Sequence, residues 1–284
     1  MNFKEKVSGK VCVVHLVRKK NGIDTFEKFL KSYKFFYPCI NHVLIIIYKG
    51  FKYKGDILPY EKKLLEINHQ IYRIPDIGYD VNAYFWCFKK YQNNFDYFCF
   101  LNSFSEINAK GWLKKLIEPL NDKSIGLVGA SSSYGSMVPI YHPSSPSIPL
   151  WKKILKPLLL PLLIKFKALS FNKFPNPHIR TNGFIISRSV LSSIKFPLLF
   201  RKCDAYKFES GKFSLTNQVK LLGLKCVTVG KDGSIYNEIE WPQSNIFWSS
   251  KQENLLIKDN QTNSYENSNF SHRKKLNIFA WKGF

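Results

Sequence analysis

A short apolar run that stops abruptly in polar residues constrains the fold of this chain more than any other feature. Residues 97–101 read Tyr-Phe-Cys-Phe-Leu, and residues 102–105 read Asn-Ser-Phe-Ser. A run this short and this apolar is typical of a buried strand. In open α/β sheets, the side chains beyond the carboxyl end of such a strand face a crevice in which ligands bind. The run therefore predicts an interior strand with a ligand site at its end.

Further apolar runs alternate with segments of helical periodicity along most of the chain. Strand-like runs occupy 10–17, 42–48, 69–74, 97–101, 124–130 and 225–229, and helix-like segments occupy 25–36, 59–67, 81–90, 112–117 and 215–222. Residues 178–190 read as a strand that runs into a helix. Alternation at this spacing is typical of βαβ units, so we expect an α/β fold with a largely parallel sheet flanked by helices. We expect 225–229 to be its last strand and 129–136 to be a flexible loop near the sheet edge.

Charge and cysteine usage limit the partners and the compartment. Lys and Arg number 43 against 20 Asp and Glu, which favours anionic partners, although lysine richness can also reflect the base composition of the source genome. The basic residues are scattered and form no recognised nucleic-acid module, so we expect no nucleic acid. None of the six cysteines forms a Cys-x-x-Cys pair, which argues against zinc. Three of them lie inside apolar runs, and the N-terminus lacks a signal-peptide core, so we expect a cytoplasmic location.

The stretch 76–107 resembles the family 2-like glycosyltransferases of the GT-A fold. In that family a Gly-containing loop and a helix precede an apolar strand that ends in an Asp-x-Asp metal motif. Here Gly78 lies in the loop, and Asn102, Ser103 and Phe104 follow the strand where the acids would stand. Over roughly residues 10–230, the resemblance implies a GT-A-like, Rossmann-like enzyme. It would move a sugar from a nucleotide-sugar donor to a glycan or lipid-linked acceptor in surface polysaccharide synthesis.

The resemblance also implies the domain plan and the cofactor. The GT-A-like domain would cover 1–240, with 131–175 as an insertion, and 241–284 would be an extension that wraps the catalytic face. The missing acids do not support Mg²⁺ or Mn²⁺ held by paired carboxylates, although Glu106 could act as a single ligand.

By the same resemblance, the donor nucleotide lies between the end of the first strand, the 76–84 loop and the 102–106 turn. Carboxylates of Asp76 and Asp80 can accept hydrogen bonds from ribose hydroxyls, although Asp80 fits a helix N-cap equally well. Arg18, Arg180 or Lys212 could neutralise the diphosphate without a metal. The residues expected to bind the donor are His15, Val17, Arg18, Asp76, Gly78, Asp80, Asn102, Ser103, Ser105 and Arg180. A histidine at a strand end, such as His15, is also commonly structural.

An acid before the helix at 215–222 would supply the general base that takes the acceptor proton. Glu209 is the nearest acid and Asp204 the next. The alternative for Glu209 is a helix cap or a partner for a lysine. Because the acidic motif at 102–104 is degenerate, a catalytically inactive binding or scaffold protein stays open as the alternative function. A basic nucleic-acid-binding protein is a weaker alternative that rests on charge alone.

Residues 150–167 are apolar, studded with lysines and headed by Trp151. The segment is too short and too interrupted to span a membrane. Its composition suits an interfacial helix on anionic lipid, here the inner face of the membrane. A core helix or a lid packed on the sheet is the alternative.

Overall fold

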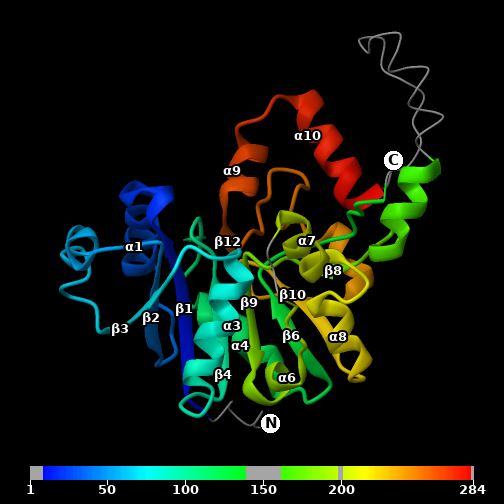
Figure 1. Ribbon diagram of the computed structural model, residues 1–284. Helices are drawn as coiled ribbons and strands as arrows, with labels where there is room; N and C mark the ends of the chain where they lie inside the picture. Colours follow the sequence, from blue (N-terminus) through cyan, green and yellow to red (C-terminus); the bar gives the residue numbers. More distant parts are fainter. Residues whose placement is uncertain (1–8, 139–160, 198–200, 283–284) are drawn as a thin grey trace, which may run out of the picture.

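The computed structural model describes residues 9–138, 161–197 and 201–282. Its centre is one eight-stranded sheet (Figure 1). The strands are β1 (Val11–Arg18), β2 (Val43–Lys49), β3 (His69–Ile74), β4 (Tyr97–Leu101), β6 (Ile125–Gly129), β9 (Gly183–Ser187), β10 (Lys225–Val229) and β11 (Ile235–Tyr236). They lie side by side in the order β11-β10-β6-β9-β4-β1-β2-β3.

The predicted fold class is confirmed. Strands β1 to β4 run parallel to one another, as do β6 and β10, whereas β9 runs antiparallel to β4 and β6 and β11 runs antiparallel to β10. The sheet is therefore mostly parallel, as expected from the alternation of strand-like and helix-like segments. Two small sheets accompany it: β7 (Ser132–Ser133) pairs with β8 (His178–Ile179), and β5 (Glu106–Ile107) pairs with β12 (Ile257–Lys258).

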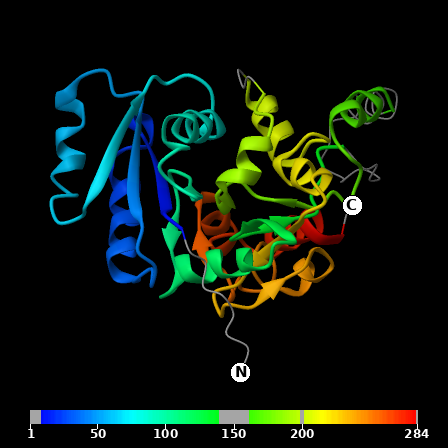
Figure 2. The same cartoon turned by 90° about the horizontal axis from the view of Figure 1, so that it is seen from below.

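Helices cover both faces of the sheet, which is why its interior strands are apolar throughout rather than alternating. The α-helices are α1 (Ile23–Phe35), α2 (Leu58–Glu61), α3 (Asp80–Tyr91), α4 (Trp112–Ile117), 161–170, α6 (Arg188–Ser193), α7 (Lys202–Ser210), α8 (Leu215–Leu221), α9 (Asn260–Glu266) and α10 (Phe270–Asn277). Short 3₁₀ turns occupy Lys19–Asn21, Lys54–Asp56, Glu118–Asn121 and Glu238–Gln243, and Ile278–Lys282 forms a π turn. Helices α1 and α3 lie on opposite sides of the sheet (Figure 2).

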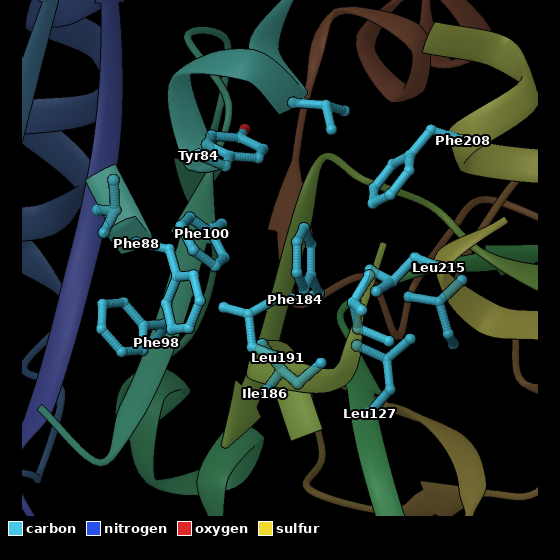
Figure 3. Close-up of a cluster of buried hydrophobic side chains, with 14 of the residues drawn as sticks. Tyr84, Phe88, Phe98, Phe100, Leu127, Phe184, Ile186, Leu191, Phe208 and Leu215 are labelled. Atoms are coloured by element: carbon cyan, nitrogen blue, oxygen red, sulfur yellow. The ribbon is translucent and has the colours of Figure 1, made fainter. Parts of the chain in front are cut away.

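Two hydrophobic clusters hold these layers together, and β4 contributes to both because successive side chains point to opposite faces. Phe98 and Phe100 pack with Tyr84 and Phe88 of α3 (Figure 3). Cys99 and Leu101, by contrast, belong to the cluster under α1, α2 and α4. The first cluster reaches across β9 to Phe208 of α7, so one continuous core fixes α3 and α7 relative to each other (Figure 3).

Three expectations about elements are wrong. The helix expected over 59–67 ends at Glu61, because the chain then continues in turns whose bonds join residues three apart, such as Ile67 N to Leu64 O. Strands β11 and β12 follow 225–229, which was expected to be the last strand; two-residue strands are too short to show periodicity. Within the expected loop 129–136, Ser132 and Ser133 are buried and form β7.

The C-terminal segment lies over the carboxyl edge of the sheet. Helices α9 and α10 lie above the sheet, on the side away from the N-terminus (Figure 1). In the part of the chain that the structure describes, no helix combines the length and the apolar character that crossing a bilayer requires. Of the segment 150–167 that was expected to lie on a membrane, residues 150–160 are outside the described residues.

Candidate active site

A pocket of about 440 Å³ opens at the carboxyl edge of the sheet. Its walls come from five places in the fold: the end of β1, the start of α3, the turn after β4, the β8–β9 connection with α7, and the start of α9. The lining residues are Arg18, Asn21, Tyr79, Asp80, Val81, Asn102, Ser103, Phe104, Arg180, Thr181, Asn182, Lys202, Ala205, Tyr206, Glu209, Asp259, Asn260 and Gln261. Six of the residues predicted from the sequence thus meet in one pocket: Arg18, Asp80, Asn102, Ser103, Arg180 and Glu209.

Asp80 is the first residue of α3 and faces this pocket. The N-cap of α3 is Tyr79, so the alternative of N-capping by Asp80 is wrong, and the carboxylate is left to interact with the helix dipole and the pocket. Burial raises the pKa of Asp80, and Glu209 raises it further, whereas Lys49 and Arg18 oppose the rise. Burial therefore favours either protonation of the Asp80 carboxyl group or a hydrogen bond donated to its carboxylate.

The loop before α3 is held by a lysine that the sequence analysis missed. Lys49 ends β2, is fully buried, and donates from Nζ to the carbonyl oxygens of Gly78 and Tyr79 at 2.6 and 3.1 Å. Burial, with Arg18 nearby, lowers the pKa of Lys49 to about 8. Gly78 has φ +68°, and a Cβ there would come within 2.4 Å of the Asn82 side chain, so the loop requires glycine.

Asp76 anchors Arg18 and does not line the pocket. Arg18 donates from Nε and Nη2 to Asp76 Oδ1 at 3.2 and 3.0 Å, and Lys20 Nζ lies 3.4 Å from Oδ2. Burial alone would raise the pKa of Asp76, but Arg18 and Lys20 outweigh it and hold the pKa below its usual value. Asp76 thus orients Arg18 at the mouth of the site.

The turn after β4 uses its polar atoms internally. Asn102 Oδ1 accepts from Phe104 N at 2.9 Å and from Ser105 Oγ at 3.1 Å, which buries Ser105 beneath the pocket. Ser103 Oγ accepts from Asn21 Nδ2 at 2.7 Å. Glu106 points elsewhere, where its Oε1 accepts from Asn263.

The oxygen atoms of the turn after β4 do not fit a resident Mg²⁺ or Mn²⁺. Both ions prefer carboxylate oxygens, and the amide and hydroxyl oxygens of the turn are already used as hydrogen-bond acceptors. Across 9–138, 161–197 and 201–282, no three His, Cys, Asp or Glu side chains come together as a metal site would require.

Arg180 forms the buried wall of the pocket. Its Nη2 lies 2.7 Å from Asp259 Oδ2, its Nη1 donates to Ser131 Oγ at 3.2 Å, and its guanidinium lies 4.0 Å from the centre of the Phe247 ring. Asp259, which sequence reasoning missed, also caps α9. The ion pair between Arg180 and Asp259 therefore connects the C-terminal segment to the site.

Asn182 lines the same wall and was also missed. Its side chain is buried and its Oδ1 accepts from Ser131 Oγ at 2.8 Å. Its Nδ2 has no hydrogen-bond partner among the described residues. A buried amide donor without a partner is costly.

The two acids expected near 209 occupy different positions. Glu209 lies at the end of α7, lines the pocket and accepts from Thr181 N at 3.0 Å. Asp204 lies in the first turn of α7, where its Oδ2 accepts from Arg201 N at 2.9 Å, and it does not line the pocket. Lys212 also lies outside the pocket.

His15 and Val17 are core residues on the α1 face of β1. The His15 ring stacks on Phe29 with centroids 3.6 Å apart, and neither of its nitrogens has a partner among the described residues. Burial lowers the pKa of His15 to about 3, so the ring is neutral. The structural alternative for His15 therefore fits its surroundings.

No family model and no curated protein matches the sequence. Among solved structures, the chain is similar to glucosyl-3-phosphoglycerate synthase from Mycobacterium tuberculosis in complex with UDP, with 16% identity, a TM-score of 0.44, and coverage of 78% of this chain and 71% of that one. It is also similar to the mannosyltransferase PcManGT from Pyrobaculum calidifontis in complex with GDP-Man and Mn²⁺, with 11% identity, a TM-score of 0.47, and coverage of 85% and 61%. For TarS from S. aureus, the identity is 14%, the TM-score 0.42, and the coverage 69% and 52%. The chain thus spans less than two thirds of the latter two proteins.

Proposed function

We propose that this chain is a glycosyltransferase that uses a nucleotide-sugar donor and a glycan or lipid-linked acceptor. The observation that carries the proposal is the composition of the 440 Å³ pocket at the carboxyl edge of the sheet. Besides the Arg180–Asp259 ion pair, it combines the carboxylates of Asp80 and Glu209 with the cations Arg18 and Lys202. These residues lie beside the strand ends where open α/β sheets bind nucleotides.

The cations would take the place of a metal at the leaving group. Arg180 is held in a buried ion pair with Asp259 at 2.7 Å. Arg18 also pairs with Asp76, but that pair is partly exposed, so Arg18 and Lys202 are the pocket cations that we expect to meet a diphosphate. Arg18 is pre-oriented by Asp76. Asp80 would accept hydrogen bonds from the ribose hydroxyls, because burial makes a donor partner favourable for its carboxylate.

Glu209 would act as the general base. In the transfer, the acceptor oxygen forms a bond with the anomeric carbon, the bond from that carbon to the phosphate oxygen breaks, and the acceptor proton passes to Glu209. The hydrogen bond from Thr181 N to Oε1 fixes the carboxylate and leaves Oε2 for the acceptor.

Calorimetric titration with UDP, GDP, CMP and TDP and their sugars tests the proposal. At least one should bind, and Lys202→Ala should weaken it about tenfold or more through loss of a charge-assisted contact. Lys212→Ala is the matched control, since this exposed lysine lies outside the pocket. Absence of nucleotide binding, or equal loss in both variants, would contradict the proposal.

An inactive binding protein is the second candidate, favoured by Asn102 and Ser103 where paired acids were expected. It predicts nucleotide binding without release of sugar from any donor.

We also infer that helix 161–170 rests on an anionic bilayer. Leu162, Phe166 and Leu169 lie on one side of the helix, at positions three and four residues apart, and are 67%, 71% and 74% exposed. Lys165 and Lys167 lie on the same helix, as expected for contact with acidic headgroups. This placement supports peripheral attachment rather than the core-helix alternative.

A further inference from the structure

A second, smaller chamber adjoins the 440 Å³ pocket on the side of the C-terminal segment. Its volume is about 200 Å³, and Tyr206, Arg180, Glu209 and Gln261 line both spaces. Glu209 therefore stands at the junction, with the proposed donor pocket on one side and this chamber on the other.

Aromatic rings form much of the chamber wall. Trp248, Phe247, Phe279 and Tyr206 all line it, and Trp248 is half-buried, so part of its indole is available. Trp248 stacks on Phe247 with ring centroids 4.4 Å apart and planes inclined by 21°. The Phe279 ring lies 6.3 Å from that of Trp248. We call this space the aromatic chamber.

The loop that presents Trp248 is held in an unfavourable backbone conformation. Trp248 has φ +45°, a value that is exceptional for a bulky residue. Two side chains hold its backbone: Trp248 N donates to Gln252 Oε1 at 3.1 Å, and Asn277 Nδ2 donates to Trp248 O at 2.7 Å. Gln252 is itself fixed, because its Nε2 donates to Thr262 O at 3.1 Å. Such strain persists where the surroundings over-determine it, commonly at ligand sites.

The chamber also has a polar side. His178 is buried, and its Nδ1 lies 2.8 Å from the carbonyl oxygen of Asn176, which fixes Nδ1 as the donor. Burial lowers the pKa of His178, so Nε2 is the acceptor nitrogen of a neutral ring. Arg180 and Gln261 are polar residues at the boundary with the larger pocket.

We propose that the aromatic chamber binds one sugar ring of the acceptor, with its C–H face against Trp248 and a hydroxyl directed at Glu209. A pyranose has an apolar C–H face and a rim of hydroxyls, which matches a wall of aromatic rings beside acceptor and donor groups. A carboxylate or phosphate acceptor fits less well because it would meet the Glu209 carboxylate. The inference rests on the proposed function and deepens it, by assigning the acceptor to the saccharides.

Fluorine NMR of the full chain carrying 5-fluorotryptophan tests this assignment. Trp248→Phe identifies the Trp248 resonance, and Trp112, fully buried in the cluster under α1, serves as the internal reference. The probes are the methyl glycosides of glucose, galactose, mannose and N-acetylglucosamine, titrated with and without UDP or GDP. At least one should shift the Trp248 signal in a saturable manner and leave the Trp112 signal in place.

Tyr206→Ala should weaken the binding of that glycoside about tenfold, through loss of one stacking wall. No shift of the Trp248 signal with any probe up to roughly 100 mM, far above the millimolar range of weak ligands, would overturn the assignment. The nucleotide titration separates this result from the proposed function: nucleotide binding without a sugar response overturns only the sugar site. A sugar response without nucleotide binding upholds the site and overturns the transferase.

Discussion

Replacing Glu209 by Gln removes a proton acceptor and leaves the pocket otherwise intact. Gln has the same shape, and its Oε1 can still accept the hydrogen bond from Thr181 N that Glu209 accepts at 3.0 Å. General-base catalysis contributes roughly 10²–10⁴-fold to turnover, which corresponds to about 2.7–5.4 kcal/mol of transition-state stabilisation. We therefore expect kcat to fall by that factor, while the free energy of unfolding changes by no more than about 1 kcal/mol.

The assay follows release of the nucleotide from the donor sugar in the presence of acceptor, with donor affinity measured separately by calorimetry. Donor affinity should change little, because Glu209 takes the acceptor proton rather than binding the diphosphate. Asp204→Asn is the matched control: it makes the same acid-to-amide change on α7, at a residue outside the pocket, and the amide oxygen of Asn can still accept the hydrogen bond from Arg201 N. Loss of activity in Asp204→Asn with an active Glu209→Gln would move the base to Asp204. Full activity in both would refute the catalytic reasoning.

Three further predictions concern the metal, the membrane and the pH dependence of stability. Because the residues beyond β4 offer no paired carboxylates, activity should largely survive EDTA; complete loss with recovery on Mn²⁺ would contradict this. Joint replacement of Leu162, Phe166 and Leu169 by Ser should abolish flotation with anionic liposomes, whereas Leu221→Ser, at a site 78% exposed elsewhere, should not; unchanged flotation of the triple variant would refute the inference. The pKa of Lys49 is about 8 in the folded chain and near 10.5 in the unfolded chain, so between these pH values the unfolded chain binds more protons. The free energy of unfolding should therefore increase by as much as about 3 kcal/mol as the pH rises through this range. Denaturant unfolding of Lys49→Met should lack this increment, and parallel pH curves for the two proteins would show that Lys49 is not the source.

Strand positions were accessible from the sequence because burial on both faces leaves an unbroken apolar run. Residues 97–101 and 225–229 are such runs, and they were bounded as the structure has them. The bounds of 69–74 also agree, although β3 is a largely exposed edge strand. Arg18 and Asp80 line one pocket with Asn102 and Ser103, because each lies where a strand ends or a helix begins on one edge of the sheet. Such positions follow from chain order alone.

The site residues that the sequence analysis missed depend on contacts between segments far apart in the chain. Lys49 follows an apolar run and looks like a solvated strand end, yet it is buried by the loop 78–79, whose carbonyls satisfy it. Asp259 lies in a segment without periodicity, and it is brought to the site by the pairing of β12 with β5 and by its contact with Arg180. Alternation along β1 could have placed His15 and Val17 on the same face as Val13, away from the pocket.

A crystal structure of the chain with the tightest-binding nucleotide tests the central claim most directly. The account predicts the diphosphate within hydrogen-bonding distance of Arg18 and Lys202, and the ribose hydroxyls at Asp80, all in the 440 Å³ pocket at the carboxyl edge of the sheet. A nucleotide bound elsewhere on the chain, with that pocket empty, would contradict it.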